Sequence, residues 1–235
     1  MCGRYATTRS AGDLSGLFES YDETDDRVRS SHNVAPTSAV PMVRLSAEGH
    51  RALSAGRWGF LPPWSRSPGD GARMINARAE TVATSRAYAP AFARRRCLVP
   101  ADGWYEWVRR PEGGRQAYYM TPADASVLAL AGIWTTWEGP AGPVLTFSVL
   151  TTAAVGELAE VHERMPLLLP RERWASWLGP VDDPAALLAP PAVGWLAGLE
   201  IRPVGPAVGN VRNDGPELTA RVPAQAVPTG DMTLF

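Results

Sequence analysis

The first four residues contain the side chain with the most distinctive chemistry in this sequence. Removal of Met1 would leave Cys2 with a primary α-amine and a thiol on adjacent carbons. Such a 1,2-aminothiol condenses with an aldehyde: the amine forms an imine, and the sulfur then closes a five-membered thiazolidine ring. Both groups react near neutral pH, because an α-amine titrates at about 7.7–8.0 and a thiol at about 8.5.

The remaining composition offers no competing amine. All 23 basic residues are arginine, so no lysine can form a Schiff base, and carbonyl chemistry has to use the amino end of the chain. Taken alone, a cysteine after the initiator methionine is more often without a function. Cys2 therefore has to be judged together with the residues that could assist it.

A carboxylate beside an indole is the first such partner. Trp104 and Glu106 lie in an expected strand at residues 104–108, and alternate residues of a strand share one face. Desolvation on a partly buried face raises the pKa of a glutamate, which suits the proton transfers in both directions that imine formation needs. For Glu106 alone, a solvent-facing strand residue is the alternative.

Arginine and tryptophan gather in one part of the chain. Residues 51–115 contain 12 Arg against 5 Asp and Glu, although the whole chain has a formal net charge of −1. Trp64 lies in a proline-rich loop that cannot form regular structure, which makes it a candidate for stacking on a base. The alternative is a solvated face with Trp64 capping the core. Arg94, Arg95 and Arg96 are expected to close a helix, where cations complement its dipole.

The overall composition is that of a globular chain of 235 residues, 45% hydrophobic and 20% charged. We expect no signal peptide, because the amino end is polar, and no transmembrane helix, because no apolar run approaches about 18 residues. Cys2 and Cys97 are too few for a disulfide scaffold, which suits a reducing cytosol, and Cys97 is expected to be a core thiol. Three histidines without paired spacing argue against a structural zinc site.

Hydrophobic periodicity predicts both strands and helices. Strands are expected at residues 40–45, 51–60, 97–100, 104–108, 116–121, 126–135 and 144–152, and helices at residues 10–20, about 81–95, 153–161 and 170–178. Residues 180–198, rich in Pro, Ala and Gly, are expected to be loosely structured. We predict one α+β domain over residues 1–222, with a twisted, partly barrel-like antiparallel β core flanked by helices, and a tail at 223–235.

Seven stretches of the sequence carry a resemblance to a known family. They are residues 1–5 (MCGRY), 33–36 (NVAP), 57–59 with 63–64 (RWG, PW), 75–81 (INARAET), 97–107, 162–166 (HERMP) and 208–213 (VGNVRN). Together, and in this order, they resemble the SRAP family (SOS response-associated peptidase), the abasic-site processing proteins. The sequence departs from the family pattern at His32, where a tyrosine is common, and at Ser65, where a second tryptophan may stand.

The resemblance implies a reaction at Cys2. Once a peptidase activity has released Met1, Cys2 would condense with the ring-opened deoxyribose aldehyde of an abasic site in single-stranded DNA. The resulting covalent thiazolidine crosslink would shield the strand from breakage. By the same resemblance, Asn76 would hold the sugar, Glu106 would act as general acid and base, and His162 would assist ring opening and the imine steps.

The resemblance also implies how DNA is held and where the protein acts. Contacts to phosphate or sugar are expected from Arg4, Arg78, Arg86 and Arg164, and wedges against the flanking bases from Trp64 and the loop at Pro36. The expected partner is single-stranded DNA with an abasic site, including sites at junctions with duplex. We expect a monomer in the bacterial cytoplasm, associated with the nucleoid when bound to DNA, without a metal, a cofactor or a membrane.

Two other classes of function fit parts of the sequence. Glutamine amidotransferases, which are N-terminal-nucleophile amidohydrolases, also begin Met-Cys-Gly, but their Asn-Gly oxyanion motif is absent here. A non-catalytic reader of modified or damaged DNA would use the arginine and tryptophan residues and would not need Cys2.

Overall fold

The structure is a computed structural model that describes residues 2–111 and 113–223. Its centre is a closed barrel, whose wall follows the order β11 (Gly142–Ala153), β10 (Leu128–Gly139), β7 (Arg96–Ala101), β4 (Ala39–Leu45) and β5 (Arg51–Trp58). Neighbours in this order are antiparallel, whereas β5 meets β11 in parallel, where Phe147 pairs with Trp58. The predicted barrel-like core is confirmed, with a parallel closure that the sequence did not indicate.

Short strands extend the barrel wall along β11. β6 (Asn76–Arg78) runs parallel to β11 beyond the point where β5 leaves it, and β12 (Arg164–Pro166) pairs with β11 beyond the point where β10 leaves it. β2 (Tyr21–Glu23) pairs in parallel with the first half of β5, on the edge opposite β4. The two extensions bring the segment at Asn76 and the segment that follows His162 to the same end of β11.

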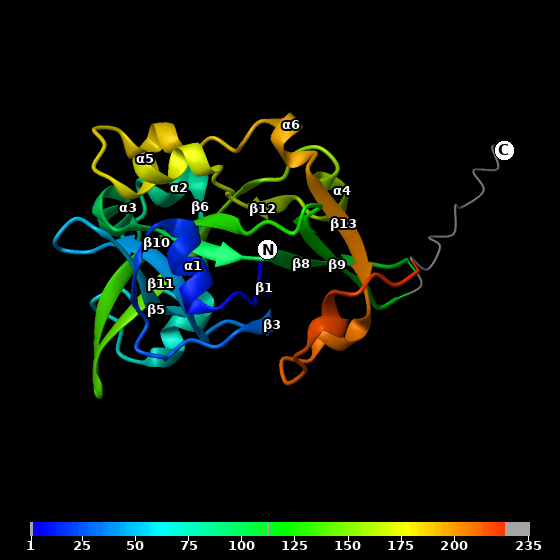
Figure 1. Cartoon of the computed structure of the whole chain (residues 1–235), viewed down its shortest axis with the longest axis horizontal. Helices are drawn as coiled ribbons and strands as arrows, with labels where there is room; N and C mark the ends of the chain where they lie inside the picture. The colour runs from blue at the N-terminus through cyan, green and yellow to red at the C-terminus, as the bar shows by residue number, and fades with distance from the viewer. Residues whose placement is uncertain (1, 112, 224–235) are drawn as a thin grey trace.

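A second, antiparallel sheet lies beside the barrel. Its order is β13 (Leu199–Val204), β9 (Arg115–Pro122), β8 (Gly103–Arg109), β1 (Tyr5–Thr7) and β3 (Ser31–Val34). Figure 1 shows β8, β9 and β13 on one side of β1 and the barrel strands on the other. Because β7 leads into β8 through the single residue Asp102, the second sheet is positioned directly by the barrel.

Short helices cover the outside of the two sheets. They are α1 (Ala11–Phe18), α2 (Ala79–Val82), α3 (Ala89–Arg94), α4 (Leu158–Val161), α5 (Trp174–Leu178) and α6 (Val193–Leu196), with 3-10 turns at Pro68–Arg73, Arg171–Arg173, Pro184–Leu188, Pro206–Gly209 and Pro216–Thr219. α1 begins at Ser10, whose hydroxyl accepts from the Asp13 N–H, and its buried Phe18 stacks on Trp174 at 4.4 Å between ring centroids.

The strands divide their side chains between two cores. On β7, Cys97 and Val99 face the barrel interior, while Leu98 between them faces the layer under α1, α3 and α5. This alternation is the period of two expected of a strand. It explains why β7, β10 and β11 read as uninterrupted apolar segments, since both of their faces are buried.

Several predicted boundaries need correction. The helix expected at about 81–95 is two short helices, because Pro90 has no N–H for a continuous helix and lies instead in the first turn of α3. The expected helix at 153–161 is only α4, since β11 continues to Ala153, and 170–178 begins as a 3-10 turn before α5. Arg96 lies in β7 rather than in a helix.

Further elements occupy stretches without a strong sequence pattern. The segment 180–198 contains a 3-10 turn and α6, and β13 follows it. Of the predicted tail at 223–235, only residue 223 lies within the described residues. No helix among residues 2–111 and 113–223 is long and apolar enough to span a membrane.

Candidate active site

Cys2 lies at the start of β1 and is fully buried against the barrel interior. Its carbonyl oxygen accepts a hydrogen bond of 2.7 Å from Nδ2 of Asn76. Asn76 is itself fixed because it opens β6 beside Val149 of β11, and its backbone carbonyl accepts from the Tyr88 hydroxyl at 3.3 Å. The amino end of the chain is therefore anchored to the barrel wall by the residue that the sequence predicted as a sugar contact.

Glu106 brings a carboxyl group to the same site. As the sequence predicted, it shares a face of β8 with Trp104, and the two residues are 3% and 1% exposed. Burial raises the pKa of Glu106, while nearby His162 acts in the opposite direction. Burial also raises the pKa of the Cys2 thiol, and the negative charge of Glu106 raises it further. Glu106 thus interacts electrostatically with both Cys2 and His162, although the three residues are far apart in the sequence.

The position of His162 is fixed through its Nδ1 atom. His162 follows α4, and Nδ1 accepts a hydrogen bond of 2.9 Å from the backbone N–H of Arg164. A backbone N–H can only donate, so Nδ1 of the neutral ring carries no proton and Nε2 does. The Arg164 carbonyl oxygen also lies 3.2 Å from Nδ1.

The side chain of Arg164 joins two elements of the site. Its guanidinium group forms a bidentate pair with Glu80 of α2 at 2.7 and 3.0 Å and donates to the Thr151 carbonyl of β11 at 2.5 Å. This side chain is only 13% exposed. In this structure Arg164 clamps α2 and β12 onto β11, and its expected phosphate contact stays a prediction.

Arg4 has a comparable place in the second sheet. One nitrogen of its guanidinium group donates to Oδ1 of Asn33 at 2.7 Å and to the Val208 carbonyl at 2.8 Å. The Asn33 amide in turn donates to the carbonyls of Asn210 and Asn213 at 3.0 and 2.7 Å. Three of the stretches that carry the family resemblance therefore form one hydrogen-bonded bracket that holds β1 and β3 in place.

The remaining predicted DNA contacts lie on exposed segments. Trp64 is 56% exposed, and the guanidinium carbon of Arg86 lies 5.6 Å from the centroid of its ring. Arg78 is exposed on β6, two residues from Asn76, and Pro36 lies in the loop between β3 and β4. The hydrogen bond of 2.9 Å from the indole of Trp137 to the Ser65 carbonyl fixes the loop that presents Trp64.

Among the polar groups near Cys2, sequence reasoning did not single out Tyr5. The Tyr5 hydroxyl, the Trp104 indole nitrogen and Asn76 Oδ1 are buried without a hydrogen-bond partner among the described residues. Burial raises the pKa of Tyr5, and the Cys2 thiol raises it further. The alternation of side chains in strands could have indicated Tyr5, because Tyr5 on β1 lies directly opposite Trp104 on β8. Among the described residues no group of His, Cys, Asp and Glu is arranged to hold a metal ion.

The chain is similar to known proteins over nearly its whole length. The family model described as "SOS response associated peptidase (SRAP)" matches residues 1–211. The abasic site processing protein YedK of Escherichia coli is 32% identical over 225 residues, covering 93% of this chain and 98% of that protein. YoqW of Bacillus subtilis, with the same descriptive name, is 31% identical over 222 residues, with the same two coverages.

More distant comparisons agree with these. HMCES of Gallus gallus, also named an abasic site processing protein, is 30% identical over 263 residues, which cover 92% of this chain and 76% of that protein. A crystal structure of a protein from Bacteroides thetaiotaomicron has the same fold, with a TM-score of 0.80, 22% identity, and coverage of 94% of this chain and all of that one. With a family model matched over residues 1–211, this chain belongs to the SRAP family.

Proposed function

We propose that this protein processes abasic sites in DNA by forming a covalent thiazolidine crosslink through Cys2. The amine of Cys2 adds to the sugar aldehyde and releases water to give an imine. The Cys2 thiol then adds to the imine carbon, so that a C–S bond forms and a proton moves from sulfur to nitrogen. An acylated nitrogen cannot form the imine, so Met1 must first be cleaved off.

The observation that carries this proposal is the hydrogen bond from Asn76 to the Cys2 carbonyl beside the buried Glu106. This hydrogen bond fixes Cys2, which carries both the amine and the thiol, beside Glu106, whose pKa is raised by burial. A neutral carboxylic acid can protonate the departing hydroxyl of the carbinolamine, and the resulting carboxylate can take a proton back from nitrogen or sulfur. His162, neutral with its proton on Nε2, supplies a hydrogen-bond donor for the sugar oxygen that is freed on ring opening.

The proposed substrate is single-stranded DNA, including junctions with duplex. Arg78 and Arg86 are exposed cations that can contact phosphates, and the exposed Trp64 can stack on a base next to the lesion. The names of the relatives support abasic sites as the lesion. We propose in addition that the protein acts as a monomer in the bacterial cytoplasm and needs neither metal nor cofactor.

Incubation with a single-stranded oligonucleotide that contains one abasic site tests the proposal. We expect wild-type protein to give a heat-stable adduct on denaturing electrophoresis, with an intact mass of protein lacking Met1 plus DNA minus one water. Cys97→Ala is the matched control, because it removes the other thiol and should leave the adduct intact. Cys2→Ala should give at most an imine that survives only after borohydride reduction.

The same experiment separates the other classes of function. A reduction-independent adduct of undiminished yield in Cys2→Ala would contradict thiazolidine formation. Full binding and full protection of abasic DNA by Cys2→Ala would favour a non-catalytic reader. Ammonia release from glutamine, which we expect to be nil, would instead identify an amidohydrolase.

A further inference from the structure

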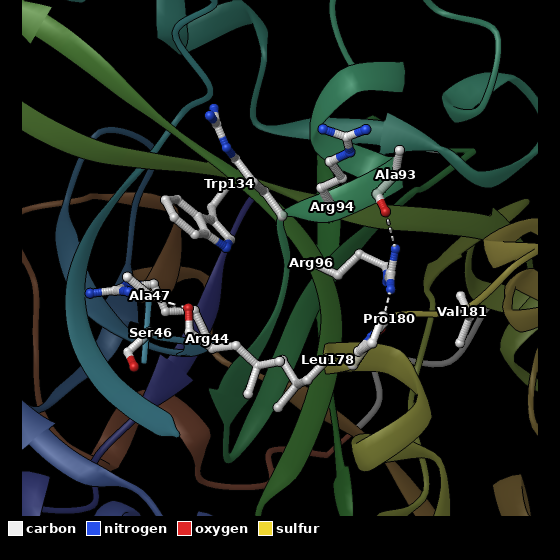
Figure 2. A pocket seen from close by; sticks show the side chains of 13 residues that line it. Arg44, Ser46, Ala47, Ala93, Arg94, Arg96, Trp134, Leu178, Pro180 and Val181 are labelled. Atoms are coloured by element: carbon white, nitrogen blue, oxygen red, sulfur yellow. Dashed lines mark hydrogen bonds between the residues drawn. The ribbon is translucent and has the colours of Figure 1, made fainter. Parts of the chain in front are cut away.

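A cavity of about 630 Å³ lies at the start of β7, lined by Arg44, Leu45, Ser46, Ala47, Ala93, Arg94, Arg95, Arg96, Trp134, Leu178, Gly179, Pro180 and Val181. Four of the described residues that line this cavity are arginines, and none of them is Asp or Glu. Figure 2 shows Arg44 and Trp134 on one side of this cavity and Arg94 and Arg96 on the other. The size is that of a typical small-ligand pocket.

Arg96 builds the wall of the cavity. It is 3% exposed, and its guanidinium group donates to the carbonyls of Phe92 and Ala93 at 2.8 Å, of Trp177 at 2.6 Å, and of Gly179. These bonds join the last turn of α3 to the loop after α5 (Figure 2). The partners are all neutral carbonyls, so the positive charge of Arg96 is left without a carboxylate and adds to the potential of the cavity.

Trp134 orients two more guanidinium groups. The guanidinium carbons of Arg44 and Arg95 lie 5.3 and 5.8 Å from the centroid of its ring, and Arg95 also donates to Oγ1 of Thr135 at 3.2 Å. Since cations already cover the indole, the ring serves to hold arginines rather than to stack on a ligand. Holding these side chains in place lowers the entropy that an arginine loses when it binds an anion.

The charge of the cavity is mostly uncompensated. Arg44 pairs with Glu23 at 3.0 Å, and Glu23 also approaches His50. Arg94 and Arg95 are both exposed, and neither has a carboxylate partner among the described residues. Two guanidinium forks facing solvent next to a buried third cation match the geometry and charge of phosphate esters.

We propose that this cavity binds phosphate esters of the same DNA strand whose abasic site reacts at Cys2. That the strand is DNA rests on the proposed function. Arg96 opens β7, while the other end of β7 leads through Asp102 to Gly103 and the strand of Glu106. Six strand residues span about 17–20 Å. The strand between them therefore separates the cavity from the reactive cysteine by several nucleotides of DNA, so the phosphates bound here would not be those next to the lesion.

The test compares Arg94→Gln/Arg95→Gln with Arg29→Gln/Arg109→Gln, which removes the same charge at two exposed residues outside the cavity. Binding of undamaged oligothymidylates of 4 and 20 nucleotides is measured against salt concentration, so the result does not depend on chemistry at Cys2. For the 20-mer we expect the cavity variant to lower the slope of log K against log salt by about 1.4, since each phosphate contact on a single strand contributes about 0.7. The 4-mer has fewer phosphates, so its loss of slope should be no larger.

Three outcomes decide the proposal once thermal melting has shown that both variants fold. A larger loss of slope on the 20-mer in the cavity variant than in the control variant supports it. Equal slopes in the two variants overturn it. Binding of inorganic pyrophosphate is measured by calorimetry on the same proteins. If the cavity variant loses pyrophosphate binding but keeps the wild-type 20-mer slope, the proposal is also overturned, and the cavity is assigned to a free phosphate compound. A failed adduct assay at Cys2, by contrast, would refute the proposed function and leave these slopes unaffected.

Discussion

Two glutamates of the site respond to their surroundings in opposite directions. Burial raises the pKa of Glu106, whereas the hydrogen bonds from Arg164 lower the pKa of Glu80. Glu80 is half-exposed and faces a fixed cation, so its charged form is favoured. Glu106 is enclosed by β8 and the barrel, so its neutral form is favoured. Only the second situation favours a carboxyl group that keeps a proton to donate at a pH above its ordinary range.

Glu106 should make the protein less stable as pH rises. The unfolded chain loses the Glu106 proton at about pH 4.3, while the folded protein keeps it to higher pH. The free energy of unfolding therefore falls, by up to about 1.4 kcal/mol per pH unit, from about pH 4.3 up to the raised pKa. Glu106→Gln should abolish this part of the decline, so that in urea unfolding the variant gains stability relative to wild type as pH rises above about 4.3.

Glu80→Gln serves as the control of opposite sign. Its folded-state pKa is lowered, so its contribution to stability is present above the ordinary glutamate pKa and is lost as pH falls through the lowered value. Relative to wild type, Glu80→Gln should be least stable at neutral pH and should converge with it in acid. Parallel pH profiles for the two variants would contradict both assignments.

His162 should be a neutral imidazole with its proton on Nε2. The backbone N–H of Arg164 points at Nδ1, which leaves Nε2 as the protonated nitrogen. Two-dimensional ¹⁵N NMR of the imidazole side chains in alkaline solution distinguishes the two tautomers of the neutral ring directly. His162→Gln identifies the signals by their loss. A proton on Nδ1 would rule out the donor role proposed for Nε2.

At the level of residues, the sequence predicted well where strand parity decides the outcome. The shared face of Trp104 and Glu106 follows from alternation, and it was confirmed. Arg4 and Arg164 show the limit of such reasoning. Their partners Asn33 and Glu80 lie 29 and 84 positions away in the sequence, and no local pattern shows that a guanidinium group will be used in a bracket or a clamp.

At the level of elements, the barrel is closely packed where β10 pairs with β7. A Cβ atom on Gly132 would lie 2.7 Å from Sγ of Cys97 and 3.2 Å from Cγ2 of Val99. Gly132 pairs directly with Cys97, so the missing side chain leaves room for the sulfur inside the barrel. Cys97 is therefore a core thiol, as the sequence indicated, and a glycine on the neighbouring strand accommodates it.

Gly132→Ala should destabilise the barrel by about 1–3 kcal/mol, the usual range for overpacking. Cys97→Ala removes the sulfur that the new methyl group meets, so the double variant should be more stable than the sum of the two single effects predicts. A coupling free energy above about 0.5 kcal/mol, measured by chemical denaturation of all four proteins, is expected for residues in contact. Additive effects would mean that the strand shifts instead of the side chains clashing.

The longer strands could be predicted from the sequence because their signal is contained within each segment. β9, β10 and β11 contain eight or more residues with apolar runs, and each was expected within a few positions. β1, β6 and β12 have three residues each and exist because longer strands offer them unpaired backbone. The short strands nevertheless carry or flank most of the candidate site, which explains why its residues could be named but not placed together.

At the level of the whole molecule, the site depends on contacts that span nearly the entire chain. The carbonyl of Cys2 is held by Asn76, Arg4 binds the Val208 carbonyl, and Tyr105 donates to the His32 carbonyl at 2.8 Å. Closure of the barrel between β5 and β11 joins segments that β6 to β10 separate in sequence. Such long-range pairing predicts slow, cooperative folding, in which the amino end becomes ordered together with the barrel.

An amino-terminal extension that cannot be removed should abolish the crosslink and also destabilise the protein. The extension blocks the amine of Cys2. Because Cys2 is fully buried, the added chain must also disturb the packing around it in order to reach solvent. We expect no adduct with abasic DNA and a lower melting temperature than wild type. The same sequence joined through a cleavable site should recover both properties after cleavage. An extended protein that crosslinks at the normal rate would show that another group reacts.

The burial of Cys2 also limits how a gene encoding this domain can change. The proposed chemistry needs a free amine on Cys2, so any residues that precede Cys2 must be removed by a cleavage that makes it the first residue. Recombination that places another coding segment before this one would inactivate the protein at once, whereas a segment added after it leaves the Asn76–Cys2 contact untouched. We therefore expect domain gain in this lineage to occur on the downstream side.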